Sequence, residues 1–590
     1  MSRAPSSATT AASRKAAATP SRCTRLPSGA SRRTPGDRTP GPASRRPTYP
    51  CARAPPSACR CHPLSPDGPA TVPPLRGRQE HVPPPPEPRP EHVDVLIIGA
   101  GLSGIGAACH LRRESPDHSY AVLESREASG GTWDLFRYPG VRSDSDMFTL
   151  GYSFRPWPGE KALADGASIL RYVRDTARAY GVDQHIRYRH TVVRAQWSSA
   201  QARWTVHAER TDTGEPAVFT CAFLHACTGY YRYDEGYAPP FPGRERFTGP
   251  VVHPQQWPEG LDVTGQRVVV IGSGATAVTL VPSLAERGAR VTMLQRSPSY
   301  VTTLAARDPI ARLLRGTLPA KAAYAAVRWK NVLVQLGSYQ LSRRQPKLMK
   351  ALLRRGLRRW LPANYAIDTH FAPRYNPWDQ RLCLVPDGDL FRALRAGTAE
   401  IVTDHIDTFT ETGLALRSGA ALEADVIVTA TGLNVRLLGG LTLTVDGQVV
   451  DPAHTVAYKG MMLSGVPNFA LTLGYTHASW TLKADLVARY VCRVLNHLRD
   501  TGRQVATPTP PPFTGDGELS PLLDLTSGYV QRSLATLPRQ GPSAPWRLHQ
   551  NYLRDLRLMR RAPVDDGWLR FTSPTPPPST ETEPQAPARA

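Results

Sequence analysis

Residues 93–104 read Val-Asp-Val-Leu-Ile-Ile-Gly-Ala-Gly-Leu-Ser-Gly, and this stretch decides the fold class. Its near-continuous apolar half predicts a buried parallel strand. Of the glycines that follow, Gly99 permits a tight turn, Gly101 lets the backbone approach a pyrophosphate, and Gly104 lets the next helix pack on the strand. That helix is expected over Ile105–Arg112, and its N-terminus offers unpaired N–H groups to phosphate oxygens. The stretch therefore predicts a dinucleotide-binding unit.

An acidic residue follows at the distance that such a unit requires. The expected second strand, Tyr120–Leu123, ends at Glu124, which lies 20 residues after Gly104. A carboxylate at this place accepts hydrogen bonds from ribose hydroxyl groups. The first unit is therefore expected to bind a cofactor whose ribose 2′-hydroxyl is free, namely FAD.

Paired glycines and alternating charges come next. The segment Gly130–Trp133 predicts backbone that lies against a second part of the ligand, such as a flavin ring. Arg142 and Asp144 alternate, so they share a face if the chain is extended; a surface turn with an ion pair is the alternative interpretation. The residues predicted to bind FAD are Gly99, Gly101, Ser103, Gly104, Glu124, Gly131, Thr132, Trp133 and Asp144.

A second strand–turn–helix pattern occupies residues 267–287. An apolar strand over Arg267–Ile271 leads through a glycine-rich turn into a helix over Val278–Arg287. The next strand ends at Arg296-Ser297, 19 residues after Ala277, where the first unit has its acid. An arginine and a hydroxyl would bind a 2′-phosphate that a carboxylate would repel, so this unit is expected to bind NADPH. The residues predicted to do so are Gly272, Ser273, Gly274, Ala275, Thr276, Ala277, Arg296 and Ser297.

The connector between the two units, Phe247–Pro258, reads F-T-G-P-V-V-H-P-Q-Q-W-P. Its three prolines exclude a regular helix and a central strand. A segment that only joined two domains would be polar and variable, whereas this one is rigid and aromatic. We interpret it as a hinge whose contacts matter; the alternative is a proline-rich surface loop held in place by Trp257.

The two glycine-rich units and this connector together resemble the class B flavoprotein monooxygenases, in particular the Baeyer–Villiger branch. The fixed positions of that branch's F-x-G-x-x-x-H-x-x-x-W-P signature are Phe247, Gly249, His253, Trp257 and Pro258. The resemblance extends over about residues 92–572. It implies that Arg381 is the active-site arginine and that Asp144 orients it. It also implies that His253 couples NADP⁺ binding to domain movement and transfers no proton.

The resemblance implies an FAD monooxygenase that uses NADPH and O2 and works through a C4a-peroxyflavin. Such an enzyme inserts one oxygen atom into ketones, giving esters or lactones, and oxygenates the sulfur of thioethers and thioamides. The nearest alternative is an N- or S-oxygenating flavin-containing monooxygenase without ketone activity. A flavin-dependent disulfide reductase is disfavoured because no C-x-x-C or C-x-x-x-x-C pair occurs. The expected partners are O2 and a small lipophilic ketone or sulfur compound, and the oligomeric state is left open.

The chain is therefore expected to be an α/β protein with two Rossmann-like domains, a helical insert and disordered tails. The predicted boundaries are residues 1–91 for a basic extension, 92–230 for the first part of the FAD domain, 231–264 for the linker, 265–300 and 375–430 for the NADPH domain, 301–374 for the insert, 431–572 for the second part of the FAD domain and 573–590 for a tail.

Composition separates the basic tail from the rest. The net charge is +23, and residues 1–90 supply 15 Lys and Arg against 4 Asp and Glu. Because much of the excess lies in a proline-rich segment that cannot form a core, we expect no nucleic-acid partner; DNA binding through the tail is the alternative. No apolar run is long enough to cross a membrane, and no metal site is expected. Nine cysteines without paired spacing indicate a cytoplasmic protein.

Basic residues also gather in the expected insert, at Arg343, Arg344, Lys347, Lys350, Arg354, Arg355, Arg358 and Arg359. Apolar residues are interleaved with them, at Leu348, Leu352, Leu353, Leu357 and Trp360. One interpretation is a face that makes weak peripheral contact with a membrane surface. The other, which we favour at this stage, is the solvated basic surface of a helical insert.

Overall fold

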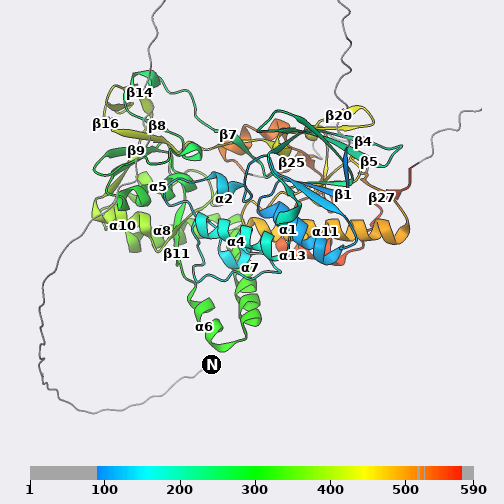
Figure 1. Cartoon of the computed structure of the whole chain (residues 1–590). Helices are drawn as coiled ribbons and strands as arrows, with labels where there is room; N and C mark the ends of the chain where they lie inside the picture. Colours follow the sequence, from blue (N-terminus) through cyan, green and yellow to red (C-terminus); the bar gives the residue numbers. More distant parts are fainter. Residues whose placement is uncertain (1–89, 514–518, 524, 575–590) are drawn as a thin grey trace, which may run out of the picture. The chain divides into compact units, whose positions relative to one another are not determined.

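A computed structural model describes residues 90–513, 519–523 and 525–574. The extension expected over residues 1–91 and the tail expected over 573–590 lie almost entirely outside these residues. The described chain is mixed α/β, as predicted, and its two main sheets each carry one of the glycine-rich turns (Figure 1).

The larger sheet has nine strands and carries the first glycine-rich turn. Its order is β20-β19-β4-β5-β6-β1-β2-β3, and β23 pairs with the end of β6. β1 lies parallel to β2 and β6, whereas β4, β5 and β6 form an antiparallel meander. The bounds are β1 Glu91–Ile98, β2 Tyr120–Leu123, β3 Ile186–Arg187, β4 His190–Ser198, β5 Arg203–Arg210, β6 Pro216–Ala226, β19 Thr442–Val445, β20 Gln448–Val450 and β23 Phe469–Leu471. The chain thus returns to this sheet after residue 440.

Two long helices pack beside β1, namely α1 (Leu102–Glu114) and α11 (Trp480–Thr501), and they lie next to each other (Figure 1). The first ten residues of α1 are buried. Six of these ten residues are Gly, Ala, Ser or Cys, and such small side chains let the helix approach its neighbours closely. On the same side lies α4, Gly166–Ala179.

The smaller main sheet has five parallel strands in the order β13-β10-β9-β17-β8 and carries the second glycine-rich turn. Helices α5 (Ala275–Glu286) and α10 (Asp389–Ala396) pack against it. Its edge strand β8 comes from the connector, which is where a proline-flanked strand can be accommodated. The strands are β8 Val251–Val252, β9 Arg267–Ile271, β10 Arg290–Gln295, β13 Ala399–Thr403 and β17 Val426–Thr429; an antiparallel sheet of β14 Ile406–Thr410, β15 Gly413–Leu416 and β16 Ala421–Glu423 follows β13.

The expected insert is largely helical. It contains β11 Val301–Leu304, α6 Pro309–Thr317, α7 Ala320–Arg344, α8 Pro346–Trp360 and α9 Ile367–His370, and the chain then enters β12 Cys383–Pro386, which pairs with β11. α6 and α7 form a hairpin that extends away from the strands (Figure 1). The buried Arg328 of α7 ties this hairpin to the first unit, because its Nη1 donates to the carbonyl oxygens of Phe148 and Gly151, both at 2.7 Å.

Short elements complete the described chain. They are α2 Thr132–Leu135, α3 Met147–Leu150, β7 Tyr231–Gly236, β18 Leu433–Val435, β21 Ala457–Tyr458, β22 Met462–Leu463, β24 Val505–Pro508, β25 Ser520–Pro521, α12 Gly528–Gln531, β26 Arg539–Gln540, α13 Tyr552–Leu556 and β27 Leu569–Thr572. None of the helices described is long and apolar enough to cross a membrane.

Candidate active site

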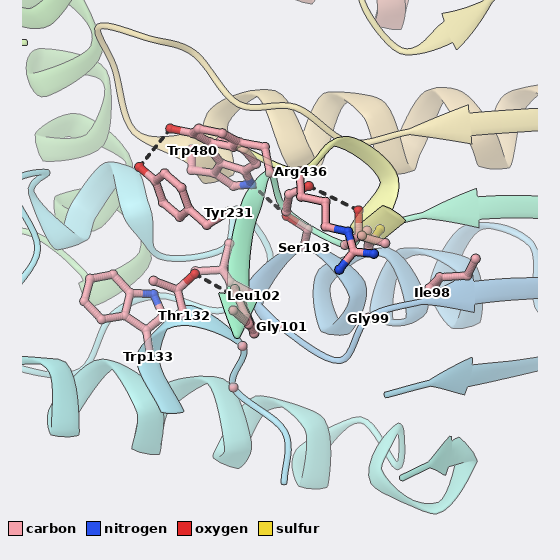
Figure 2. Close-up of a pocket in the computed structure, with 18 of the residues that line it drawn as sticks. Ile98, Gly99, Gly101, Leu102, Ser103, Thr132, Trp133, Tyr231, Arg436 and Trp480 are labelled. Carbon is pink, nitrogen blue, oxygen red and sulfur yellow. Dashed lines mark hydrogen bonds between the residues drawn. The ribbon is translucent and has the colours of Figure 1, made fainter. Parts of the chain in front are cut away.

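A cavity of about 510 Å³ opens where β1 ends and α1 begins (Figure 2). The predicted FAD residues that line it are Gly99, Gly101, Ser103, Glu124, Gly131, Thr132, Trp133 and Asp144. Gly104, the remaining one, does not line the cavity. A Cβ at Gly104 would lie 1.8 Å from the carbonyl oxygen of Gly99, so this glycine lets α1 pack against the turn, which is the packing use expected of it.

The first glycine-rich turn leaves the end of α1 open to the cavity. Gly99 has φ +99°, and a Cβ there would lie 2.7 Å from the carbonyl oxygen of Cys227. Gly101 is the N-cap of α1, and no side chain caps the helix. The N–H groups of the first turn are therefore available to an anionic ligand.

Glu124 follows β2, lies beside this turn and is buried. Its Oε2 accepts a hydrogen bond from the backbone N–H of Ala100 at 2.8 Å, and its Oε1 accepts one from Arg126 at 3.0 Å. Burial raises the pKa of the carboxyl group above its ordinary value, against these hydrogen bonds. The Ser125 hydroxyl also donates to Oε1 at 3.4 Å, so Oε2 is the oxygen that keeps a lone pair for a ribose hydroxyl.

Aromatic residues form the opposite wall. The indole Nε1 of Trp480 donates to Oγ of Ser103 at 2.7 Å, which ties the start of α11 to the start of α1 (Figure 2). The same indole stacks on Tyr230 with ring centroids 5.3 Å apart. Thr132 and Tyr233 join their hydroxyl groups at 3.2 Å. A flat ligand would thus lie among ring faces and backbone.

Arg381 and Asp144 meet in the cavity wall. Nη1 of Arg381 donates to Oδ2 of Asp144 at 3.3 Å, and each side chain is about one-third exposed, at 32 % and 33 %. Burial opposes the charge of Arg381, but Tyr230 and Asp144 outweigh it and raise its pKa well above the ordinary value. Arg142 instead pairs with Asp389 at 2.6 Å. The two residues that alternate in sequence therefore have different partners, and the ion pair within one surface turn is not formed.

A group of rings lies near Arg381. Tyr339 of α7 stacks on His477 with centroids 3.9 Å apart, and Trp378 meets His477 edge-on at 6.2 Å. Trp378 has φ +70°, a conformation that costs a bulky residue energy and that recurs at functional sites. Burial lowers the pKa of His477 to about 4, so this ring is neutral at physiological pH.

The connector contacts the smaller main sheet and the two-stranded sheet of β7 and β18. Phe247 is buried in the core of the smaller main sheet, and Trp257 packs against that sheet's second core cluster. His253 Nδ1 accepts from the N–H of Gln255 at 3.2 Å, which leaves Nε2 to donate to the carbonyl of Gly432 at 3.1 Å. The side-chain amide of Gln255 donates to the carbonyls of residues 232 and 233, both at 2.9 Å. Burial lowers the pKa of His253, so the imidazole is neutral at physiological pH.

The predicted NADPH residues surround the second turn and line none of the cavity described above. Gly272 has φ +141°, and a Cβ there would lie 2.4 Å from the carbonyl oxygen of Ala430. Gly274 caps α5 without help from a side chain, and Ala277 is buried against the sheet. Ser273 Oγ donates to the carbonyl of Ser297 at 2.9 Å.

The remaining members of that set lie around the same turn. Ala275 and Thr276 form the first turn of α5, while Arg296 and Ser297 are exposed beyond β10. The first unit contacts α5 through the loop at Gly140, where a Cβ would lie 2.8 Å from that of Ser283.

Comparison with known proteins decides the family. The model of the flavin-binding monooxygenase-like family matches residues 152–499, and that of the NAD(P)-binding Rossmann-like domain matches residues 97–156. The chain is 58 % identical over 482 residues to the FAD-containing monooxygenase EthA of Mycobacterium tuberculosis, covering 82 % of this chain and 98 % of that protein.

The chain belongs to the flavin-binding monooxygenase-like family.

Other similar proteins agree with this assignment. This monooxygenase is 45 % identical over 502 residues to the probable FAD-binding monooxygenase AlmA of Acinetobacter baylyi, covering 84 % of this chain and 99 % of that protein. A steroid monooxygenase bound to NADP superposes with a TM-score of 0.64 at 23 % identity, over 82 % of this chain and 100 % of the other. A cyclohexanone monooxygenase gives 0.60 at 20 % identity, over 71 % and 90 %. These structures share the fold. The predicted class, a flavin monooxygenase with FAD and NADP as cofactors, is confirmed.

Sequence reasoning missed several residues of this monooxygenase's cavity. Trp480, Tyr475, Arg436 and the aromatic run at residues 230–233 line the cavity, yet none was predicted as a site residue. The run follows a Cys-Thr-Gly turn at the end of an apolar strand, which is a signal that the sequence offered. Trp480 and Tyr475 lie far along the chain from the first turn, and the return of the chain to the first sheet brings them to the cavity.

Proposed function

We propose that this monooxygenase inserts one atom of O2 into ketones and also oxygenates sulfur, with NADPH as the electron donor. The observation that carries the proposal is the Arg381–Asp144 ion pair in the wall of the cavity that holds the first glycine-rich turn. A fixed cation stabilises negative charge that develops on the oxygen of an attacked carbonyl. Electrophilic oxygenation of nitrogen or sulfur creates no such charge on the substrate, so the pair favours the ketone reaction.

The cavity residues fit FAD. The open N-terminus of α1 would hold the pyrophosphate, Glu124 the ribose hydroxyls, and the backbone of Gly131 and Thr132 the ring system. Bound there, FAD would supply the activation of O2 with electrons from the nicotinamide. Trp480 would enclose the ring system, because its indole is held in place by Ser103 and stacked on Tyr230.

Arg381 would act on the substrate side. Asp144 fixes one face of its guanidinium, and no partner is recorded in the described chain for its buried Nε. Five N–H donors on one planar group leave donors for a carbonyl oxygen or a nicotinamide amide. Asp144 is a positioning residue, since we expect it to act through the arginine.

NADPH would bind at the second turn. The exposed Arg296 and Ser297 can reach a 2′-phosphate, and the N-terminus of α5 can hold the pyrophosphate. The neutral His253 joins the connector to Gly432, where the chain returns toward the first sheet. We therefore assign the connector a coupling role in domain movement and no proton transfer.

The substrate class is inferred from the rings near Arg381 and from two structural neighbours, a cyclohexanone monooxygenase and a steroid monooxygenase. An apolar carbon skeleton would pack against Tyr339 and Trp378 while its carbonyl faces the guanidinium. We also infer a reducing, cytoplasmic location, which the five buried free cysteines support.

The test is NADPH consumption with product analysis on the purified full-length chain loaded with FAD. A linear alkyl ketone and a thioether are offered separately. Ester from the ketone is the expected result. Sulfoxide without ester would favour the N- or S-oxygenating alternative, and peroxide release without either product would overturn both.

Arg381→Ala should lower ester formation by about 100- to 1,000-fold, the effect of removing a group that stabilises an oxyanion, while NADPH oxidation continues. Arg395→Ala, on the exposed surface of α10, is the matched control and should leave both rates unchanged. An active Arg381→Ala enzyme would contradict the role given to this arginine.

A further inference from the structure

The insert carries charge of one sign over a long stretch. No Asp or Glu occurs between Asp308 and Asp368, whereas 13 Lys and Arg do. Four of these cations have acidic partners: Lys330 pairs with Asp308, Arg354 with Asp368, Arg343 with Asp379, and the buried Arg328 with Asp485. The exposed remainder produces a positive field that attracts polyanions.

The same insert holds most of the exposed apolar side chains of the described chain. Twelve large hydrophobic residues are exposed, and those between residues 304 and 352 are Leu304, Ile310, Leu313, Leu318, Trp329, Leu333, Val334, Leu348 and Leu352. Scattered exposed apolar residues need no explanation, but nine of twelve within one insert do. A solvated basic surface would account for the cations and would leave the leucines unexplained.

Apolar and basic residues alternate at the end of the hairpin of α6 and α7. We define the hairpin tip as Arg312, Leu313, Leu318 and Lys321, all of them exposed. Leu313 is 66 % exposed, the largest value among the large apolar side chains of the insert, and Leu318 lies in the turn between the two helices at 41 %. Figure 1 shows α6 at the outer end of the hairpin, away from both main sheets.

The base of the hairpin is fixed while its tip stays open. Asp308 caps α6 through the N–H groups of Ile310 and Ala311, and Arg328 anchors α7 to residues 148–151. A fixed base holds the tip leucines outward, since rotation of the hairpin to bury them would break these contacts. The tip therefore exposes apolar side chains between cations on a fixed support.

We propose that the hairpin tip docks on an anionic lipid bilayer, with Leu313 and Leu318 entering the headgroup boundary and Arg312 and Lys321 contacting lipid phosphates. Charge complementarity selects this occupant, because an acid-free basic face would attract the negative surface of a membrane. Apolar side chains among the cations suit a surface with an apolar layer beneath its charges, whereas a nucleic acid offers no such layer. If the proposed function holds, docking would bring the enzyme to the phase in which lipophilic ketones dissolve.

The test is binding of the full-length, FAD-loaded protein to phosphatidylcholine vesicles with and without phosphatidylglycerol, measured by flotation without substrate. The protein should bind only the anionic vesicles, and salt should weaken binding. Arg312→Gln/Lys321→Gln should weaken it about 30-fold, from about one kcal/mol per cation, and Leu313→Ser/Leu318→Ser about tenfold.

Matched controls lie on other faces. Arg203→Gln/Arg503→Gln removes two exposed arginines, and Val193→Ser/Val449→Ser removes two exposed valines. All variants keep residues 1–90, so the basic tail contributes equally to each. Controls that bind like the wild type beside weakened tip variants would support the proposal. Tip variants that bind like the wild type, or a wild type that ignores anionic vesicles, would overturn it.

Discussion

At the scale of single residues, Arg381 and Asp144 join two parts of the chain that are 237 positions apart. The resemblance of the sequence to the Baeyer–Villiger branch implied that one orients the other, and the structure places them in contact. Because the pair is partly exposed to the cavity, it contributes little to the stability of the fold. Its main effect is to orient the guanidinium.

Asp144→Asn tests that direction. The amide keeps the size of the side chain and removes the charge that holds Arg381. Ester formation should fall about 10- to 100-fold, the usual cost of a misplaced catalytic group, while the rate of flavin reduction by NADPH changes less. Stopped-flow measurement of both half-reactions checks this. Equal decreases in the rates of ester formation and flavin reduction would show that the carboxylate acts on the cofactor and not on the arginine.

Gly236 offers a second test at this scale. A Cβ there would lie 1.9 Å from Cε1 of His253, so Gly236→Ala forces the imidazole away from Gly432. Overpacking of this kind destabilises a protein by about 1–3 kcal/mol. Unfolding in urea should show this loss, and Gly236→Ala/His253→Ala should recover part of it because the ring is gone. Strictly additive effects of the two substitutions would exclude the clash as the cause.

At the scale of elements, the glycine-rich turns behave as local units, whereas α7 depends on distant backbone. Arg328 of α7 is buried and donates to three carbonyl groups of residues 148–151. It also lies 3.6 Å from Asp485 of α11. One side chain thus fixes a 25-residue helix to the first unit.

Arg328→Met should therefore destabilise the protein strongly. The substitution keeps the apolar stem but removes the guanidinium donor from the carbonyls of residues 148–151, of which that of Phe148 keeps the Tyr324 hydroxyl, and it leaves Asp485 with one cation fewer. The free energy of unfolding should fall by about 3–5 kcal/mol. Denaturant unfolding measures it, and faster proteolysis within residues 309–344 should accompany it. Arg344→Met, exposed at the end of the same helix, is the control. A similar loss in both variants would contradict the anchoring role.

At the scale of the whole molecule, α1 and α11 are joined by a buried His110. Its ring contacts Asp485 at 3.2 Å and Glu114 at 3.0 Å, while Arg328 and Arg489 face the same carboxylates. Burial opposes protonation of His110, but the two carboxylates outweigh it and raise its pKa above the ordinary value.

The sign of the pH effect follows from this shift. A raised pKa in the folded state means that the stabilisation by His110 is complete below its unfolded pKa, near pH 6.5, and is lost as pH rises through the folded pKa. The pKa values of Asp485 and Glu114 are lowered, so both stay ionised throughout this window. The melting temperature of the wild type should exceed that of His110→Gln by more at pH 6 than at pH 9. A difference independent of pH would exclude a protonated His110.

Much of the fold could be predicted because its signals are local. Strand, glycine turn, helix, second strand and terminal residue all fall within about thirty residues in each unit, so neighbouring residues alone specify them. The choice of cofactors was predicted from Glu124 and Arg296, which occupy equivalent places in the two units. A negative charge there favours a free ribose 2′-hydroxyl, and a positive charge favours a 2′-phosphate. The rigid, non-helical backbone of the connector could be predicted because proline restricts the backbone wherever it occurs.

The cavity was decided by the tertiary structure. Trp480 reaches Ser103 across 377 residues, and Asp485 reaches His110 across 375. These contacts exist because α11 packs along the small-residue face of α1 when the chain returns to the first sheet, and no local pattern specifies that approach. The sequence by itself thus determined the two glycine-rich units, and the charges of Glu124 and Arg296 supplied the prediction of their ribose chemistry. Packing between distant segments determined which side chains enclose the cavity. Burial and contact depend on neighbours that only the folded chain supplies.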